Sequence, residues 1–323
     1  MKNAVYKLPT DFIERMRLIF PSIKFPNLMH TFTEKKPTTF RINSLKIDPR
    51  EAVDKLKMLG FRIEKVSWYA EAFILKNAGK KELMESELYK EGYIYIQGLS
   101  SMLPPLVLAP LPGEIVLDLT SAPGSKTTQM AVLMHNQGRI VAVEQSKERF
   151  FKLLNNLKEQ GVNNTEAVLC RGENIWLKYK EHFDKVLLDA PCSSEGRFDT
   201  TNPRTFLFWK ENKVKEMVRK QKRLIFSAVQ SAKVGGKILY STCTFSPEEN
   251  EGVINWVLQR FKGKIITQKI KLNLPPNIVP GLRKWQGVEF LPEIHHCSRV
   301  LPTLEMEGFF LCLLEKINST HTP

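Results

Sequence analysis

Five short apolar runs, each followed by a segment of another pattern, constrain the fold of this chain more than any other feature. The runs are EIVLDLT at 114–120, RIVAVE at 139–144, EAVLC at 166–170, KVLLDA at 185–190 and GKILYST at 236–242. Buried strands have this composition, and strands that alternate with helices build a doubly wound, mostly parallel sheet. We therefore predict an α/β domain whose ligands bind where the carboxyl ends of the strands meet.

Two of the intervening segments predict helices. Residues 146–161 begin with Ser and end with Gly, which are favoured at the start and the end of a helix. Residues 205–234 predict one long amphipathic helix, because apolar side chains recur on one side: Val214, Met217, Val218, Leu224, Ile225, Ala228 and Val229.

The first hundred residues predict a smaller α+β unit. Helical spacing indicates a helix over 10–19, FRINSLKI at 40–47 alternates as a strand does, and 49–60 has a second helical pattern. Extended runs follow near 61–67 and 93–97, and the segment 100–113 contains four prolines. We place the domain boundary in this segment and predict two domains, 1–107 and 108–323.

Charge and cysteine usage indicate the class of partner and the compartment. The 323 residues include 48 Lys and Arg against 34 Asp and Glu, a net charge of +14, which favours nucleic acid as a partner unless the whole proteome is basic. The five cysteines form no CxxC pair, so we expect neither a metal site nor a disulfide framework. No apolar run approaches the roughly 20 residues of a membrane span, and no secretory segment begins the chain. We expect a cytoplasmic protein without membrane contact, and a monomer.

Two features at predicted strand ends suggest a nucleoside cofactor. DLTSAPGSKTTQMA at 118–131 is a turn whose small residues Ser121, Ala122, Gly124 and Ser125 let a ligand approach the backbone, although an ordinary strand-to-helix turn is the alternative. It lacks the spacing of a phosphate loop. Glu144 ends the next strand, where an acidic residue commonly accepts the two ribose hydroxyls, although a solvated surface Glu is the alternative.

Two further strand ends carry cysteines. Cys192 lies in LLDAPCSSEGRF and Cys243 in YSTCTFSPEENE. Ser246, followed by Pro247 and Glu249, predicts a capping box at a helix start, whose dipole would lower the pKa of the Cys243 thiol modestly. Taken singly, each cysteine is more often a small buried apolar residue.

The four features together suggest covalent catalysis on cytosine. C5 of cytosine is too weak a nucleophile to take a methyl group directly, whereas a thiolate that adds at C6 makes C5 nucleophilic. An acid near N3 would stabilise this adduct, and Asp189 is placed to serve if its carboxyl group is protonated.

At these residues the chain resembles the RsmB/NOL/NOP/SUN group of RNA cytosine-5 methyltransferases. LTSAPGSKT looks like the cofactor loop of that family. DAPCS looks like its Pro-Cys motif, and STCTFSPEENE looks like its Thr-Cys motif. The resemblance also extends to 87–102 and 299–316. It implies a Rossmann-like class I methyltransferase domain that uses S-adenosylmethionine, preceded by an RRM-like RNA-binding module in 1–107. Lys126 would face the active site. The residues implied to contact the cofactor or the target base are Thr120, Ser121, Ala122, Pro123, Gly124, Ser125, Lys126, Glu144 and Asp189.

The same resemblance assigns separate roles to the two cysteines. Cys243 would be the nucleophile, and Cys192 would assist release of the methylated RNA. One departure concerns the adenine site, where the family usually has Asp. Arg171 takes that position here and Glu173 lies two residues later, so either Glu173 substitutes or this contact is lost.

A basic stretch is the candidate RNA contact outside the active site. Residues 204–223 hold eight Lys and Arg with three aromatic residues at the start, which suits phosphate contact and base stacking, although a solvated helix face explains it equally well. The basic residues are Arg204, Lys210, Lys213, Lys215, Arg219, Lys220, Lys222 and Arg223, and the aromatic residues are Phe206, Phe208 and Trp209. His295 and His296 lack a third ligand, and we interpret them as structural or RNA-facing.

Two alternative functions remain open at this point. A DNA cytosine-5 methyltransferase would use Cys192 as its nucleophile and would not need the motif around Cys243. A catalytically inactive RNA-binding or assembly factor would fail to bind S-adenosylmethionine. The substrate that we favour is RNA, either ribosomal or transfer RNA, with its target base in a loop or flipped out of a helix.

Overall fold

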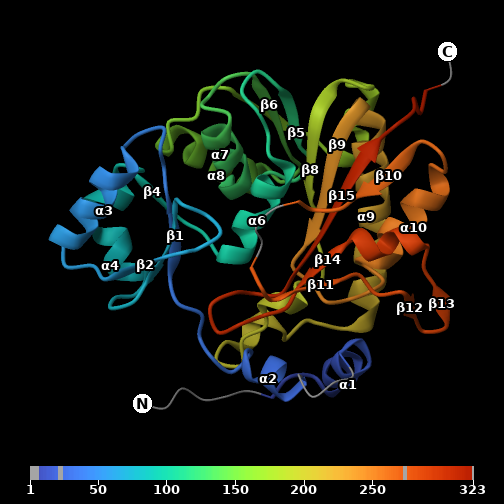
Figure 1. Cartoon of the computed structure of the whole chain (residues 1–323), viewed down its shortest axis with the longest axis horizontal. Coiled ribbons are helices and arrows are strands. Elements are labelled where there is room, and N and C mark those ends of the chain that lie inside the picture. The colour runs from blue at the N-terminus through green and yellow to red at the C-terminus, as the bar shows by residue number, and fades with distance from the viewer. Residues whose placement is uncertain (1–6, 21–24, 272–274, 322–323) are drawn as a thin grey trace.

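A computed structural model describes residues 7–20, 25–271 and 275–321 and contains a small antiparallel sheet beside a large mixed sheet (Figure 1). This arrangement confirms the predicted α/β fold with a smaller α+β unit before it. None of the helices in the described part of the chain has the length and apolar character needed to cross a bilayer.

The small sheet has the order β2-β3-β1-β4, with every pairing antiparallel. Its elements follow one another as β-α-β-β-α-β, the ferredoxin-like order that RRM domains share. They are β1 (Thr39–Ile42), α3 (Pro49–Met58), β2 (Ile63–Lys65), β3 (Ala72–Leu75), α4 (Lys80–Glu85), α5 (Glu87–Lys90) and β4 (Ile94–Ile96). The strand expected over 40–47 ends at Ile42, and β3 was not predicted.

The parallel part of the large sheet consists of the five predicted strands. Their order in the sheet is β9-β8-β5-β6-β7, and all these pairings are parallel. From β5 the chain first adds strands on one side, β6 and β7, and then on the other side, β8 and β9. Ligands bind at the switch point between β5 and β8 in sheets of this kind. The strands are β5 (Ile115–Asp118), β6 (Arg139–Glu144), β7 (Thr165–Leu169), β8 (Phe183–Asp189) and β9 (Ala232–Thr242).

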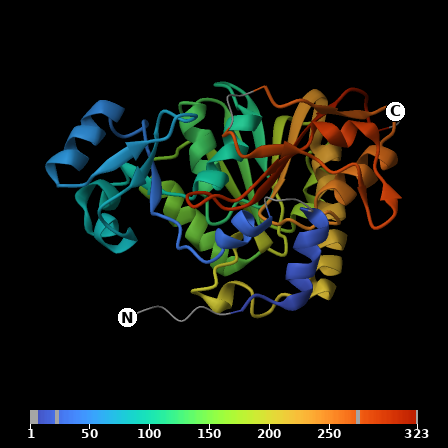
Figure 2. The same cartoon turned by 60° about the horizontal axis from the view of Figure 1, so that its bottom comes forward.

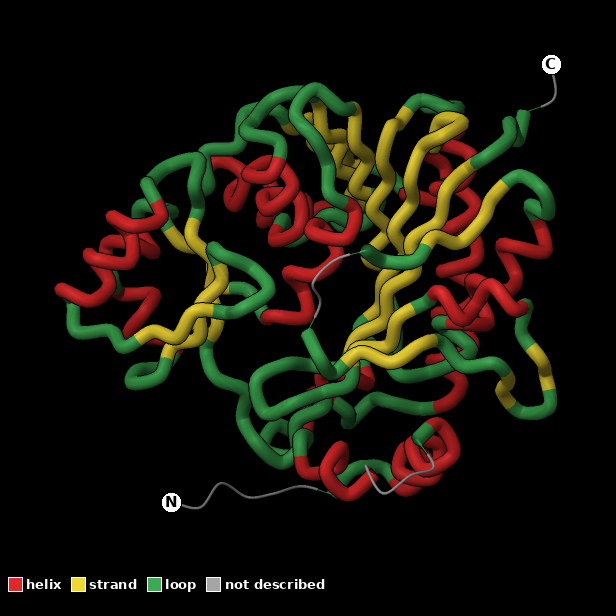
Figure 3. The backbone as a smooth tube through the Cα atoms, viewed as in Figure 1, coloured by secondary structure: helices red, strands yellow, loops and turns green. Residues whose placement is uncertain are grey.

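An antiparallel extension of this sheet lies beyond β9 and was not predicted. Strand β15 (Phe309–Lys316) pairs with β9 and with β10 (Ile265–Gln268), and β14 (Ser298–Val300) and β11 (Ile278–Pro280) continue the sheet. A short ribbon of β12 (Lys284–Trp285) and β13 (Val288–Glu289) lies nearby, before the 3₁₀ helix η4 (Pro292–His296). Figure 3 shows the mixed sheet with helices on both sides.

Helices cover the large sheet as the doubly wound pattern requires. They are α7 (Ser125–Leu133), α8 (Lys147–Glu159), α9 (Glu211–Ser231) and α10 (Glu251–Arg260). Three 3₁₀ helices lie in the connections: η1 (Gly172–Leu177), η2 (Glu195–Arg197) and η3 (Pro203–Thr205). The Ser predicted to begin the helix over 146–161 caps α8, because Ser146 Oγ accepts a hydrogen bond from Arg149 N.

The long helix predicted over 205–234 is wrong at both ends. Its first residues form η3 and turns, because Phe206 and Trp209 pack into a buried aromatic cluster with Phe12 and Phe198. At the other end, Ala232 already begins β9.

Two segments from the N-terminal region pack against the domain that contains the large sheet. The proline-containing segment at the expected boundary forms α6 (Leu99–Leu108), whose apolar residues share one core with β3 and with β8, β9 and β15. Helices α1 (Thr10–Ile19) and α2 (Phe25–His30) join the aromatic cluster near Phe245, and α1 lies beside α9, where Arg15 contacts Glu211 (Figure 2). The loop that carries Cys243 therefore packs, through Phe245, against helix α1 from the N-terminal region.

Candidate active site

The two cysteines lie side by side at the carboxyl edge of the large sheet. Cys192 follows β8 and Cys243 follows β9, which are paired parallel strands. Their Sγ atoms are 3.4 Å apart, and Ser194 Oγ lies 3.6 Å from Cys243 Sγ. Both thiols are partly buried and reduced.

Their surroundings shift the pKa values of the two thiols in opposite directions. The hydrogen bond from Cys192 and the positive charge of Arg197 lower the pKa of Cys243. The hydrogen bond with Cys243, burial and the negative charge of the Cys243 thiolate raise the pKa of Cys192 well above its usual range. This arrangement favours a Cys243 thiolate that accepts a hydrogen bond from the Cys192 thiol.

The predicted capping box at Ser246 is wrong. Residues 247–250 form turns and α10 begins at Glu251, because Ser246 Oγ donates a hydrogen bond to Glu248 Oε2 at 2.7 Å. The Glu249 carboxyl group points inward, where Ser193 N and Gln221 Nε2 donate to it at 2.9 and 2.8 Å. The lowered pKa of Cys243 therefore arises from Cys192 and Arg197 and not from a helix start.

Asp189 and Lys126 form an ion pair next to the cysteines. Lys126 Nζ lies 2.7 Å from Asp189 Oδ2 and donates to Ser101 Oγ at 2.9 Å, while Ser241 Oγ donates to Asp189 Oδ1 at 2.8 Å. The Lys126 ammonium is thus held at the site by Asp189 and Ser101, while the Asp189 carboxylate accepts from Lys126 and Ser241.

The turn after β5 is held against the neighbouring strands. Ser121 donates to Val143 O through both N and Oγ at 2.9 Å, and Thr120 Oγ1 donates to Asp189 O at 2.8 Å. Gly124 has φ +110°, and a Cβ there would lie 3.1 Å from Leu153 Cδ1. Only glycine adopts this backbone without strain, so the turn keeps its shape before α7.

A cavity of about 230 Å³ lies beside this turn. Glu144, which is 3% exposed, lines it; Glu144 Oε1 accepts from Ser146 N at 2.8 Å, and Arg149 Nη1 lies 3.5 Å from Oε2. Glu173 also lines the cavity, whereas Arg171 is exposed and is not among the lining residues. A buried carboxylate, a second acidic side chain and a turn of small residues suit a nucleoside cofactor.

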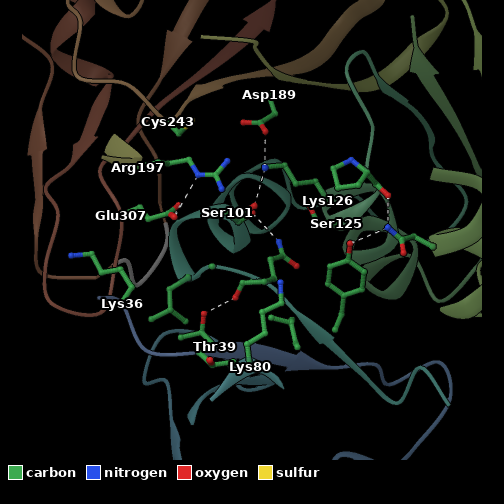
Figure 4. A pocket seen from close by; sticks show the side chains of 18 of the residues that line it. Lys36, Thr39, Lys80, Ser101, Ser125, Lys126, Asp189, Arg197, Cys243 and Glu307 are labelled. Carbon is green, nitrogen blue, oxygen red and sulfur yellow. Dashed lines mark hydrogen bonds and ion pairs between the residues drawn. The ribbon is translucent and has the colours of Figure 1, made fainter. Parts of the chain in front are cut away.

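A larger cavity of about 730 Å³ separates the small sheet from the catalytic edge (Figure 4). Its wall on the side of the small unit carries the cations Lys35, Lys36 and Lys80. The opposite wall includes Lys126, and six residues line both cavities: Thr120, Ala122, Arg149, Asp189, Arg197 and Cys243. Cys243 therefore lies where the smaller cavity meets the larger one, whose lining includes both cations and acidic side chains.

Arg197 is a site residue that the sequence reasoning missed. Arg197 Nε lies 3.6 Å from Glu307 Oε1, and Gly196 N, one residue earlier, donates to Cys243 O at 2.9 Å (Figure 4). The one indication in the sequence is that Arg197 follows Cys192 within the segment DAPCSSEGRF. A basic residue in a loop gives no sign of which side chain it faces, and Glu307 lies far away in the sequence.

Burial corrects part of the predicted RNA-binding stretch. Phe206 and Trp209 are buried, and Trp209 Nε1 donates to Glu195 Oε1 at 2.9 Å, so neither is free to stack on a base. Phe208 is 80% exposed. His296 Nδ1 contacts Thr267 Oγ1 at 2.8 Å, which fits a structural role, and in the described ranges no group of three metal-ligating side chains converges.

Comparison with known proteins identifies similar chains over almost the whole length. The model for 16S rRNA methyltransferase RsmB/F matches residues 105–315, and that for the N-terminal domain of 16S rRNA methyltransferase RsmF matches 8–99. The tRNA (cytosine(49)-C(5))-methyltransferase of Pyrococcus abyssi is 35% identical over 98% of both chains. Ribosomal RNA small subunit methyltransferase F of Shewanella piezotolerans is 36% identical over 87% of this chain but only 58% of its own length. The chain thus spans nearly all of one relative and little more than half of the other.

Two solved structures have the same fold. A methyltransferase homolog protein from Pyrococcus horikoshii is 31% identical and superposes with a TM-score of 0.79 over 96% of this chain and 100% of its own. NSun6 from Pyrococcus horikoshii, crystallised with SFG, has a TM-score of 0.80 over 96% of this chain and 99% of its own at 23% identity.

Proposed function

This chain belongs to the RsmB/F family of RNA methyltransferases, with an RsmF-type N-terminal domain, and on that premise we propose which of its residues perform the reaction. The family reaction is S-adenosylmethionine-dependent methylation of cytosine C5 in rRNA or tRNA. We assign Cys243 as the nucleophile, Cys192 as the residue that assists release, and Lys126 with Asp189 as the proton-carrying pair.

The first half of the reaction uses the Cys243 thiolate. Its sulfur forms a bond to C6 of the cytosine, and the electron pair of the C5=C6 bond moves toward C5 and the N3 side of the ring. The Lys126 ammonium, held by Asp189, supplies the hydrogen bond or proton that stabilises N3. When bound, S-adenosylmethionine supplies a methyl group activated by its positively charged sulfur.

The second half of the reaction releases the RNA. The C5 proton passes to solvent water, the electron pair of the C5–H bond re-forms the C5=C6 bond, and the S–C6 bond breaks so that the sulfur of Cys243 leaves as a thiolate. A proton given to N3 returns to Lys126. The Cys192 S–H, 3.4 Å away, donates a hydrogen bond to this departing thiolate and thereby favours release. Without that donor, the covalent adduct should persist.

One observation carries the assignment of the nucleophile. The two thiols are in hydrogen-bond contact, and their pKa values are shifted apart in the direction that leaves Cys243 ionised and Cys192 protonated. The charge of Arg197 and the hydrogen bond with Ser194 add to the lowering of the Cys243 pKa, whereas burial adds to the raising of the Cys192 pKa. This asymmetry favours the RNA-type use of Cys243 over the DNA-type use of Cys192.

We assign the cofactor to the smaller cavity. The turn Thr120–Lys126 and Asp189 would surround its methionine part, Glu144 would accept the ribose hydroxyls, and Glu173 would replace Arg171 at the adenine. The buried Glu144 carboxylate at the end of β6 supports this assignment because it lies at the strand end where the family fold binds a ribose.

The larger cavity would receive an unpaired nucleotide of the RNA. Its cations Lys35, Lys36 and Lys80 come from the region 1–107, which supports that region as the RNA-binding domain and 108–323 as the methyltransferase domain. We also propose a cytoplasmic monomer. The reaction needs both thiols reduced, and every side chain assigned to it comes from one chain.

Trapping of the covalent adduct tests the assignment. Wild type, Cys243→Ala and Cys192→Ala are incubated with S-adenosylmethionine and total RNA, and denaturing gels detect protein–RNA adducts. We expect Cys192→Ala to accumulate the adduct and Cys243→Ala to form none. An adduct that needs Cys192 and survives loss of Cys243 would favour the DNA-type mechanism. Absence of both cofactor binding and adduct would favour an inactive binding factor. Sequencing of the trapped RNA distinguishes rRNA from tRNA.

A further inference from the structure

A chain of buried hydrogen bonds joins the loops that carry the two cysteines. Ser193 Oγ contacts Glu249 Oε1 on one side and Thr244 Oγ1, at 2.7 Å, on the other. Thr244 Oγ1 then contacts Glu195 Oε2 at 2.8 Å. Ser193 follows Cys192 and Thr244 follows Cys243, so this chain spans from one catalytic loop to the other.

The number of protons in this chain requires a protonated carboxyl group. It contains three oxygen–oxygen contacts, and each needs one hydrogen. The hydroxyl groups of Ser193 and Thr244 supply two hydrogens. The third must come from Glu249 or Glu195, because two ionised carboxylates can only accept.

The surroundings place that proton on Glu249. Its Oε2 atom accepts both N–H groups, from Ser193 and from Gln221, which leaves Oε1 as the oxygen that carries hydrogen toward Ser193. Glu195 instead accepts from Trp209 Nε1 and from Phe245 N at 3.1 Å. Burial raises the pKa of Glu195, and the hydrogen bonds that it accepts and the charge of Arg15 oppose this shift.

The groups around Glu249 favour its neutral form. Among the described residues, no Lys or Arg forms a salt bridge with it, and the titratable groups that act with it are Glu195 from η2, Cys192 from the loop after β8, and Tyr240 from β9. Helix α9 contributes only the neutral Gln221. Burial and the charge of Glu195 raise the pKa of Glu249 to about 8.

We propose that Glu249 is a positioning residue that keeps a proton in the working enzyme and thereby holds the Cys192 and Cys243 loops in register. With the proton, all three contacts are satisfied and the thiols stay 3.4 Å apart. Without it, two hydrogens serve three contacts and one link between the loops is lost. The inference rests on the proposed function only in taking Cys192 and Cys243 as the catalytic cysteines.

Substitution of Glu249 by Gln tests this proposal, because the amide donates toward Ser193 without a titratable proton and still accepts through its oxygen. We expect Glu249→Gln to keep neutral-pH methyl transfer within about twofold of wild type, and Glu249→Met to lose at least about tenfold. Wild type should lose activity as the pH rises through about 8, and Glu249→Gln should not show this alkaline loss. Glu289→Gln, at an exposed carboxylate on β13, is the control and should match wild type.

A substrate-free measurement separates this inference from the proposed function. Because the pKa of Glu249 is raised in the folded state, the denaturation midpoint of wild type should fall relative to Glu249→Gln as the pH rises from about 4.5 to about 8. A Glu249→Gln variant as inactive as Glu249→Met, an alkaline loss equal to that of wild type, or a midpoint difference that does not change with pH would overturn the inference. A wild type that transfers no methyl group at any pH would refute the proposed function, and the midpoints would still decide on Glu249.

Discussion

The buried ion pair between Arg299 and Glu251 gives the sharpest prediction about stability. Arg299 Nε and Nη2 donate to the two carboxylate oxygens of Glu251 at 2.6 and 2.5 Å, and the side chains are 3% and 0% exposed. Arg299 Nη1 also donates to Phe245 O at 2.9 Å, two residues after Cys243. Loss of this arginine therefore removes a support of the catalytic loop as well as a buried charge.

Arg299→Met should lower the free energy of unfolding by about 3–5 kcal/mol, because it leaves the Glu251 carboxylate buried without its partner. The surface pair Arg139–Glu166, with side chains 46% and 42% exposed, provides the matched control. Exposed pairs are screened by solvent, so Arg139→Met should cost less than about 1 kcal/mol.

Urea denaturation followed by tryptophan fluorescence measures both variants against wild type. The double variant Arg299→Met/Glu251→Met should be less destabilised than Arg299→Met alone, because no uncompensated charge remains. Equal small losses for Arg299→Met and Arg139→Met, or a double variant worse than the single one, would refute this reasoning.

Three further predictions concern the cofactor cavity and the core. Glu173→Ala should weaken S-adenosylmethionine binding about tenfold by calorimetry, and Arg171→Ala less than about twofold; the reverse order would return the adenine contact to Arg171. Burial raises the pKa of Asp118 to about 6 from an ordinary 3.8, so the folded state binds more protons in that window. Stability should therefore fall by roughly 3 kcal/mol as the pH rises from about 4 to about 6, and an unchanged pH dependence of unfolding in Asp118→Asn would contradict this. Gly308→Ala should destabilise the fold by at least about 1–3 kcal/mol in the same denaturation assay, since its Cβ would lie 2.0 Å from Phe245 Cζ; wild-type stability would show that this contact relaxes.

Local sequence patterns determined the parallel half of the large sheet and much of the site. All five predicted strands form, because short apolar runs favour strands that a sheet covered on both faces buries, although β7 at the edge of the sheet is only partly buried. The carboxyl ends of parallel strands lie at the same edge of the sheet. The sequence alone therefore predicts that Glu144, Asp189, Cys192 and Cys243 lie along one edge. Strands that are joined by helices run parallel, and the alternation of strand and helix can be recognised in the sequence.

Tertiary contacts decided the remainder. The local sequence predicts that Glu249 caps a helix. Its carboxyl group points inward instead, because Ser193 N and Gln221 Nε2 donate hydrogen bonds to it. Trp209 reads as a base-stacking residue, yet α1 covers it. In each case the partner comes from a distant part of the chain, and no local window contains it.

The sequence by itself determined the alternating strands and the two cysteines at adjacent strand ends, because these depend on short-range periodicity and strand order. Only the tertiary structure brings the two thiols into hydrogen-bond contact and shifts their pKa values in opposite directions. The hydrogen bond between the thiols shifts their pKa values apart, Arg197, held beside Cys243 by Glu307, lowers the pKa of Cys243 further, and burial raises that of Cys192. Electrostatic interactions depend on distances in space, and folding alone sets those distances between residues far apart in the chain.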